Sequence, residues 1–326
     1  MSAMLSTIQR LLLLFLLTLL TMVVNAQPVS FGLFGDVPYS NYEREQLPHM
    51  LSAMGRENLA FVVHDGDIKN GSSVCSDEVF LDILGVFNAS PVPLIYVPGD
   101  NEWTDCHRRN NGAYDPVERL RKLRSVFFAS ETSLGQKTIA LERQSRDPAF
   151  SEYRENVRWR AGGALFVGLN LPGSNNAYHG ATRGQGPVPE FIERAKANRA
   201  WLAQSFALAR AEKLAGILIV IQADPEFDAV SAGHAKPGYA DFIAQLREET
   251  LAFDGQVVLV HGDSHLQQIN QPLLNLDASA LVKNFTRVET HGYPFMGWTL
   301  GKVDAADAKV FSFFPRRWAP TSTAPP

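Results

Sequence analysis

The sequence predicts an α/β protein in which two mixed sheets pack together and are flanked by helices. In the first half, short runs of β-branched and aromatic residues alternate with segments of helical periodicity, which is typical of parallel strands joined by helices. The middle and the end of the chain instead contain strand runs separated by short turns, which favour antiparallel pairing. One chain that contains both patterns indicates mixed sheets.

Four of the predicted strands end in the dipeptide Gly-Asp. They span residues 29–36, 61–67, 93–100 and 257–263. Short runs rich in Val, Ile and Phe predict buried strands, and the glycine lets the chain turn sharply before a carboxylate. Strands that lie side by side would bring the aspartates to the carboxyl edge of a sheet, where α/β folds bind ligands. These aspartates are Asp36, Asp67, Asp100 and Asp263.

The four carboxylates together predict a metal site. Like charges at short distance raise each other's pKa, so four carboxylates do not stay ionised together without a counter-charge. Divalent cations are the simplest source of that charge, because carboxylate oxygens are their preferred ligands.

Helices are expected between these strands and in the second half. The segments 41–55 and 76–87 place apolar residues at helical spacing. Asp115 followed by Pro116 predicts another helix, because Asp favours the N-cap and Pro the first helical position. A further helix is expected at about 189–214, followed by a strand at 217–221 and a last helix at about 239–252.

The antiparallel part is expected to begin with a hairpin. Residues 156–160 and 164–169 are strand-like and are joined through Gly162 and Gly163. Further antiparallel strands are expected at 287–290, 296–303 and 309–314.

Both ends of the chain are expected to lie outside the fold. Arg10 precedes an unbroken apolar stretch that ends in small residues before Gln27, a pattern typical of a secretory signal peptide over residues 1–26. An uncleaved anchor helix is the alternative. Residues 27–316 then form one domain, and the tail 317–326 is expected to be disordered. The protein is therefore expected to be secreted or periplasmic, with no membrane segment after cleavage.

Charge and cysteine content narrow the function classes. The formal net charge is −4, whereas nucleic-acid-binding surfaces are normally basic, so a nucleic-acid partner is not expected. The chain has two cysteines, Cys75 and Cys106, which follow the second and third Gly-Asp motifs. In an exported protein such a pair predicts a disulfide, with two thiolate metal ligands as the alternative.

The order of these motifs resembles that of the calcineurin-like metallophosphoesterases. That family contains Asp-x-His, Gly-Asp, Gly-Asn-His-Asp/Glu, a lone His after a strand, and Gly-His-x-His. The resemblance covers nearly the whole mature chain and implies a four-layer α/β/β/α sandwich with a two-metal site. It implies that Asp36, Asp67, Asp100, Asp263 and His265 hold the metals, with Asp67 between them.

Several histidines of the family pattern are replaced, which marks this chain as a divergent member. Pro38 stands in place of the first histidine, and Asn101 stands where the family has a histidine credited with acid catalysis. Gln222 or Asp224 stands where a lone histidine is usual, and Asp263 replaces the first histidine of the last motif. An oxygen-rich site favours Mg²⁺, Mn²⁺ or Ca²⁺ over Zn²⁺ or Fe.

Other polar residues near the motifs are candidates for supporting roles. His64 and His261 lie at strand ends and are candidate ligands or partners that orient ligands. Lys69 lies two residues past Asp67. It is expected either to offset the carboxylates or hold a phosphate oxygen, with an exposed loop lysine as the alternative. Tyr39 and Asn175 are candidate substrate contacts, with a core aromatic and a turn residue as the alternatives.

Two functions follow from this pattern. The first is an exported metal-dependent hydrolase of small phosphoesters, in which a metal-activated water attacks and Asp67 and Asn101 are the catalytic residues. The second is a catalytically impaired scaffold of the same family that binds a ligand or a structural cation, because the replaced histidines remove imidazole groups from the site.

Overall fold

A computed structural model describes residues 27–182, 184 and 186–319. The predicted signal peptide and most of the predicted tail lie outside the described residues. The folded part continues past the predicted boundary at residue 316, because Arg317 is the last residue of a strand and the Trp318 amide donates to the Met296 carbonyl at 2.9 Å. No helix in the described part of the chain is long and apolar enough to span a membrane.

One sheet has five strands in the order β12-β11-β1-β2-β3. Three parallel strands from the first half form one side of it, as predicted. Two antiparallel strands from the end of the chain complete it. The bounds are β1 (Val29–Phe34), β2 (Phe61–His64), β3 (Leu94–Tyr96), β11 (Gly297–Val303) and β12 (Phe311–Arg317).

The other sheet has seven strands in the order β4-β5-β6-β7-β8-β10-β9. The predicted hairpin is its antiparallel pair β5–β6, and β6, β7, β8 and β10 are parallel. The bounds are β4 (Glu142–Arg143), β5 (Val157–Ala161), β6 (Ala164–Gly168), β7 (Gly216–Val220), β8 (Gln256–His261), β9 (Gln268–Asn270) and β10 (Phe285–Glu289).

One strand orientation was predicted wrongly. The strand at 287–290, expected to be antiparallel, is β10, which pairs in parallel with β8 and antiparallel only with the short β9. The segment between β8 and β10 is long enough to return to the starting end of the sheet, which a parallel connection requires. The three-residue β9 lies within that segment and carries little strand pattern of its own.

The five long helices begin and end close to the predicted positions. They are α2 (Asn41–Met54), α3 (Asp77–Asn88), α4 (Pro116–Phe127), α6 (Pro189–Ala211) and α8 (Pro237–Leu251). Asp115 caps α4 as predicted, since its Oδ1 accepts from the Glu118 amide at 2.8 Å with Pro116 at the first helical position. Short helical turns are α5 (Gly173–Asn176), α7 (Phe227–Ser231) and the 3₁₀ segments at Thr104–His107, Arg109–Asn111, Gln144–Arg146 and Pro148–Phe150.

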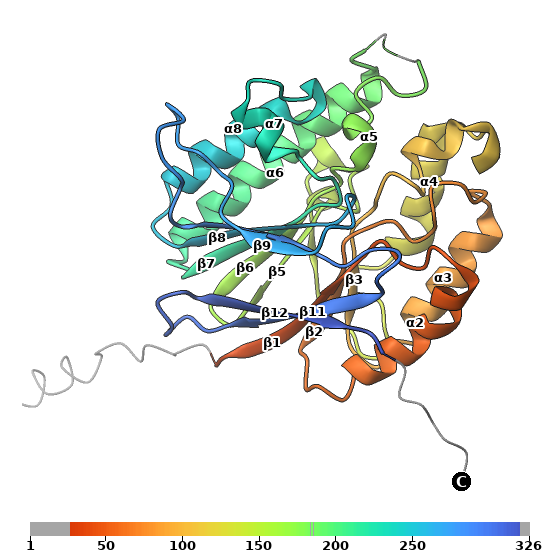
Figure 1. The fold of residues 1–326 in the computed structure, drawn as a ribbon, viewed down its shortest axis with the longest axis horizontal. Coiled ribbons are helices and arrows are strands. Elements are labelled where there is room, and N and C mark those ends of the chain that lie inside the picture. Colours follow the sequence, from red (N-terminus) through yellow and green to blue (C-terminus); the bar gives the residue numbers. More distant parts are fainter. Residues whose placement is uncertain (1–26, 183, 185, 320–326) are drawn as a thin grey trace, which may run out of the picture.

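Three apolar clusters define four layers. One cluster packs α2, α3 and α4 against the five-stranded sheet, and a second packs α6 and α8 against the seven-stranded sheet. The third lies between the sheets and includes Phe31, Phe61, Phe166 and Val258. Figure 1 shows the two sheets facing each other with helices outside each of them. The predicted α/β/β/α sandwich is confirmed.

Candidate active site

The ends of β1 and β8, which belong to different sheets, meet through Asp36 and Asp263. The Asp263 amide donates to both carboxylate oxygens of Asp36, at 3.3 and 3.1 Å, and His265 Nε2 lies 3.5 Å from Asp36 Oδ1. Gly262 permits this approach, because a Cβ atom there would lie 2.2 Å from Asp36 Oδ2. Three of the five predicted metal ligands therefore lie together.

Asp67 lies in a hydrogen-bonded group with the other predicted catalytic residue. Its Oδ2 accepts from the Tyr39 hydroxyl and from Asn101 Nδ2, each at 2.5 Å, and its Oδ1 accepts from the Asn101 amide at 3.1 Å. Asn101 Nδ2 also lies 2.7 Å from the Tyr39 hydroxyl oxygen. Tyr39 thus faces the site, and its hydroxyl lies 3.4 Å from Asp36 Oδ1 as well.

Asp100 connects the site to a loop of the other sheet. Ser174 Oγ lies 2.8 Å from both Asp100 Oδ2 and Asp105 Oδ1. A Cβ atom on Gly173 would lie 2.6 Å from Asp100 Oδ2 and 2.5 Å from Asp263 Oδ1, so both carboxylates approach the same glycine. Sequence reasoning did not find Ser174 or Asp105, which belong to none of the motifs.

Gln222 and Asp224, the two candidates for the lone histidine position, both contact Asp263. Gln222 Nε2 donates to Asp263 Oδ1 at 3.1 Å, and Gln222 Oε1 accepts from the Gly173 amide at 2.5 Å. Asp224 uses its main-chain amide, which donates to Asp263 Oδ2 at 3.2 Å, while its own Oδ1 accepts from the Glu226 amide. The Gln222 side chain is therefore the one directed at the site.

The segment that carries Ser174 has an unusual backbone. Ser174, Asn175, Asn176 and Ala177 all have positive φ angles, between 50° and 55°. Left-handed conformations cost L-residues roughly 1–2 kcal/mol each, and such strain persists only where surrounding contacts hold it. Asn175 Oδ1 accepts from the Gly238 amide at 2.9 Å, so this candidate substrate residue is bonded to α8. The Asn-Asn pair was the available sequence signal, since Asn tolerates this conformation.

Few positively charged groups balance the buried carboxylates of the site. Burial, and then neighbouring carboxylates, raise the pKa values of Asp67 and Asp100 well above the ordinary range. Burial and the nearby Asp36 raise the pKa of Asp263 to about 7. Burial lowers the pKa of His265, but its hydrogen bond and charge interaction with Asp36 outweigh this and leave the pKa raised. The site therefore favours either protonated carboxyl groups or added positive charge.

Lys69 is buried, so the alternative of an exposed loop lysine was wrong. Its Nζ donates to the main-chain carbonyls of Asn101, at 2.7 Å, and Asn70, at 2.9 Å. Burial lowers its pKa, although surrounding carboxylates oppose this. The ammonium thus supports the loop that carries Asn101 and contacts no carboxylate oxygen directly.

Two further carboxylates lie at this edge and were not singled out in the sequence. Glu102 Oε1 accepts from the amides of Asp67, at 3.1 Å, and Gly99, at 2.5 Å, which fixes both turns to each other. Asp65 is buried beside Asp36, and burial followed by that charge raises its pKa. Both residues adjoin Gly-Asp motifs, so their position was available as a signal.

His64 and His261 are buried behind the site and contact main-chain atoms. His64 Nδ1 accepts from the Gly66 amide at 3.2 Å, which leaves Nε2 to donate to the Val37 carbonyl at 2.9 Å. His261 Nδ1 lies 2.8 Å from the Gly262 carbonyl. Each histidine therefore braces a turn that carries an aspartate.

The predicted disulfide is confirmed. Cys75 and Cys106 are bonded, with their Cα atoms 5.8 Å apart, so the thiolate-ligand alternative was wrong. Both sulfur atoms lie near the main-chain carbonyl of Asn101, at 3.4 and 3.7 Å. The disulfide therefore holds the loop that presents Asn101.

Within the described residues, no three His, Cys, Asp or Glu side chains are grouped closely enough to form a ready ligand set. Neutral donors instead contact the carboxylates: Tyr39 and Asn101 on Asp67, Ser174 on Asp100 and Gln222 on Asp263. The predicted metal ligands still fit a hard cation. They are buried carboxylates, of which Asp67, Asp100 and Asp263 have raised pKa values, and His265 alone among them supplies an imidazole.

Comparison with known proteins supports the fold. No family model and no curated protein matches the chain. Among solved structures, a dimetal phosphatase from Danio rerio matches with 15% identity over 89% of this chain and 99% of that one, with a TM-score of 0.53. PhoD matches with 12% identity and a TM-score of 0.52 over 86% of this chain, which spans 65% of PhoD. The chain therefore has the fold of the calcineurin-like metallophosphoesterases, which its motif order indicated.

Proposed function

We propose that this protein is an exported, metal-dependent hydrolase of small phosphoesters. The observation that carries the proposal is the meeting of Asp36, Asp67, Asp100, Asp263 and His265 at the edge where the two sheets face each other, on a fold shared with a dimetal phosphatase. Their buried negative charge has few cationic partners, so divalent cations would relieve a cost that the protein alone does not.

The ligand atoms at the site support a proposal of two hard divalent cations. Asp67 adjoins Asp36 through Tyr39 and has Asp100 as its strongest charged neighbour, so it lies where two ions would share a carboxylate. Asp36, Asp263 and His265 would complete one site and Asp100 the other. The oxygen-rich set favours Mg²⁺, Mn²⁺ or Ca²⁺ over Zn²⁺ or Fe. When bound, such ions polarise a phosphoryl group and lower the pKa of a coordinated water.

The chain's own residues would bind and orient the phosphate. Asn101 Nδ2 and the Tyr39 hydroxyl are donors beside Asp67. Arg108 has a half-exposed guanidinium held 2.7 Å from Asp105 Oδ2 and 3.5 Å from Ser174 Oγ, which positions a cation near Asp100. Asn101 stands in place of a histidine, so the leaving oxygen lacks a general acid worth about 10²–10⁴-fold, and we expect slow turnover.

The export part of the proposal rests on two observations. The apolar N-terminal segment has the pattern of a signal peptide, and the Cys75–Cys106 disulfide is typical of an oxidising compartment.

The Asp67→Asn variant tests the proposed hydrolysis. Chelator-treated protein is reloaded with Mg²⁺, Mn²⁺, Ca²⁺ or Zn²⁺ and assayed on p-nitrophenyl phosphate and bis-p-nitrophenyl phosphate. We expect metal-dependent turnover in the parent protein and its loss in Asp67→Asn, because the shared carboxylate is neutralised. Asp82→Asn, which removes a surface carboxylate paired with Arg44, serves as the control and retains turnover. Full activity in Asp67→Asn would contradict the mechanism.

A second candidate function is a cation- or ligand-binding scaffold without catalysis. The observation that favours it is that neutral hydrogen-bond donors already contact Asp67, Asp100 and Asp263 in the described structure. The same assay separates the two functions. Thermal stabilisation by a cation with no turnover on either ester would support the scaffold.

A further inference from the structure

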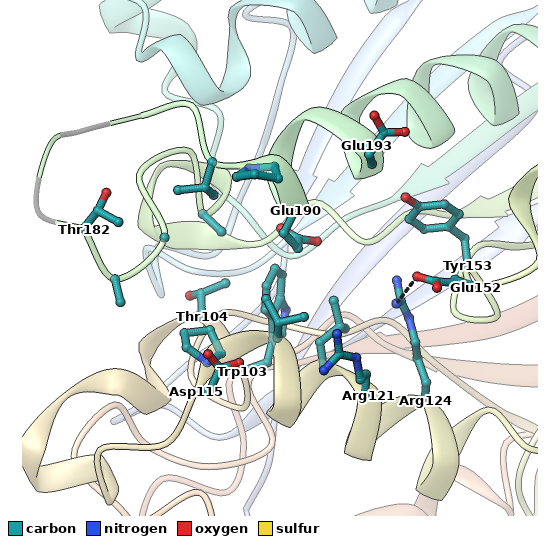
Figure 2. Close-up of a pocket in the computed structure, with 18 residues that line it drawn as sticks. Trp103, Thr104, Asp115, Arg121, Arg124, Glu152, Tyr153, Thr182, Glu190 and Glu193 are labelled. Carbon is teal, nitrogen blue, oxygen red and sulfur yellow. Dashed lines mark ion pairs between the residues drawn. The ribbon is translucent and has the colours of Figure 1, made fainter.

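A cleft of about 580 Å³ lies between α4 and the start of α6, beside the candidate active site. Figure 2 shows Asp115, Arg121 and Arg124 on the α4 side, with Glu190 and Glu193 opposite them on α6. Small-molecule sites in proteins typically measure about 300–1,000 Å³, so the cleft has the size of a ligand pocket.

Each wall of the cleft is linked to Asp100 by hydrogen bonds. Trp103 and Thr104 line it, and the Trp103 amide and Thr104 Oγ1 both donate to the Asp100 carbonyl, at 3.3 and 3.2 Å. On the other wall, Ala177 ends the left-handed turn whose Ser174 Oγ contacts Asp100 Oδ2. The cleft therefore adjoins the candidate active site on the side of Asp100.

The lining offers mainly apolar surface. Its apolar residues include Val117 and Leu120 of α4, Trp103, and Val188 and Pro189 at the start of α6. A ligand in such a lining gains by removing carbon atoms from water, whereas hydroxyl groups lose hydrogen bonds to water that the lining does not replace.

Two charged groups at the cleft are already partnered within the protein. Arg124 donates to Glu155 at 2.9 and 2.7 Å, and its guanidinium lies 5.2 Å from the centre of the Tyr153 ring. Glu190 accepts from Arg194 at 2.7 Å. These groups shape the cleft and do not demand a charged ligand.

We propose that this cleft binds the organic group of the phosphoester, and that this group is apolar and larger than a single ring, such as a fused aryl group. The inference rests on the proposed function, because it assumes that the phosphate occupies the Asp67–Asp100 region. It assigns the protein to esters of apolar alcohols and disfavours esters of polyols and sugars.

The test compares 2-naphthyl phosphate with phenyl phosphate, whose leaving groups have similar acidity but different size. We expect the parent protein to prefer the naphthyl ester in kcat/KM by about 10-fold or more, the scale expected for extra buried apolar groups. Val117→Trp fills the cleft from α4 and Ala181→Trp fills it from the opposite loop. Each should bring the ratio towards one, because the larger naphthyl group loses more of its space than the phenyl group does.

Leu81→Trp is the matched control, since Leu81 is exposed on α3 and does not line this cleft. It should keep the parent ratio. A ratio unchanged in both filled variants, with melting temperatures equal to that of the parent, would overturn the proposal.

A binding measurement keeps the cleft testable apart from catalysis. Isothermal titration of 2-naphthol, the uncharged organic group alone, into metal-free protein needs neither turnover nor a phosphate beside the carboxylates. A dissociation constant raised about 10-fold or more by Val117→Trp or Ala181→Trp supports the cleft even if no ester is hydrolysed with any metal, in which case only the proposed function fails. Equal dissociation constants in parent and variants contradict the cleft.

Discussion

The turns after β1, β2 and β3 differ in chemistry from those after β6, β7 and β8, although both sets meet at one edge. The turns of the five-stranded sheet supply Asp36, Asp67 and Asp100, which are 0%, 2% and 6% exposed. The turns of the seven-stranded sheet supply mainly neutral donors, from Ser174 and Gln222, together with one carboxylate, Asp263.

This difference shows how the protein tolerates a buried acidic cluster. Gln222 donates to Asp263 within its own sheet, and His265 lies 3.5 Å from Asp36 across the edge. Hydrogen bonds also cross the edge, because Ser174 donates to Asp100 and the Asp263 amide donates to Asp36. Such bonds contribute about 1.5–3 kcal/mol each but do not neutralise charge. Burial, together with the remaining charge, leaves the pKa values of Asp67, Asp100 and Asp263 raised, which is the condition that favours cation binding.

The largest expected effect comes from Gly66→Ala, which breaks the point where the two sets of turns touch. Gly66 has a φ of +113°, and a Cβ atom there would lie 2.5 Å from the Gln222 side chain and 2.9 Å from Gly99 Cα. Backbone strain and overpacking together should lower the free energy of unfolding by about 3–5 kcal/mol, as measured by urea titration.

Gly85→Ala is the matched control for that substitution. Gly85 lies within α3, and apart from its chain neighbours and the helix's own backbone no atom lies within 4 Å of its added Cβ. Alanine should therefore stabilise the helix by roughly 0.5–1 kcal/mol. A parent-like stability in Gly66→Ala would show that the two sets of turns do not constrain each other.

The second effect is the change in folding stability with pH that is caused by the buried histidine behind each set of turns. Burial lowers the pKa of His64 to about 4, from an ordinary 6.5, and burial also lowers that of His261. Between pH 6.5 and 4 the unfolded chain protonates His64 while the folded protein does not. Stability should therefore fall as pH falls through this window, and His64 alone accounts for roughly 3 kcal/mol.

His64→Gln isolates this contribution, because Gln does not titrate there and can still donate to the Val37 carbonyl. Urea titrations at pH 7 and pH 4.5 should show a smaller loss for this variant than for the parent. His49→Gln, at an exposed position, should keep the parent's loss. Identical losses in His64→Gln and the parent would mean that His64 is protonated in the folded state.

The smallest effect comes from adding a second carboxylate beside Asp263 in the turns of the seven-stranded sheet. Gln222→Glu keeps an acceptor for the Gly173 amide but replaces the donor to Asp263 with a carboxylate. We expect the metal-free protein to lose about 1–3 kcal/mol of unfolding free energy. The rise in melting temperature on adding Mn²⁺ should grow at the same time, because an oxygen ligand has been added. Gln136→Glu, an exposed control, should change neither quantity. A smaller rise with Mn²⁺ in Gln222→Glu would place Gln222 outside the cation site.

Most of the fold was predictable because its signals are local. The runs before each Gly-Asp became β1, β2, β3 and β8, and Asp115-Pro116 began α4 as expected. The parallel orientation of β10 was not predictable, because orientation depends on the path of the preceding loop and not on the strand's own residues. β9 was missed because three partly exposed residues carry little hydrophobic pattern.

The candidate site was predictable only for residues that belong to a motif. Asp36, Asp67, Asn101 and Asp263 could be named from the chain, and the structure places all four at one edge. Ser174 and Asp105 could not be named, since they belong to none of the motifs and the Asn-Asn pair beside Ser174 indicates a turn and not a contact to Asp100. Lys69 was named, but its burial beneath Asn101 depends on how two loops pack.

The sequence by itself determined which residue types stand at the ends of the strands, because strand, glycine and aspartate occur together within a few positions. It also determined that imidazole is scarce there. Only the tertiary structure decided that carboxylates from two sheets share one edge, that a left-handed turn brings Ser174 to Asp100, and that a cleft lies beside them. These features depend on contacts between segments far apart in the chain, and such contacts form only when the two sheets pack together.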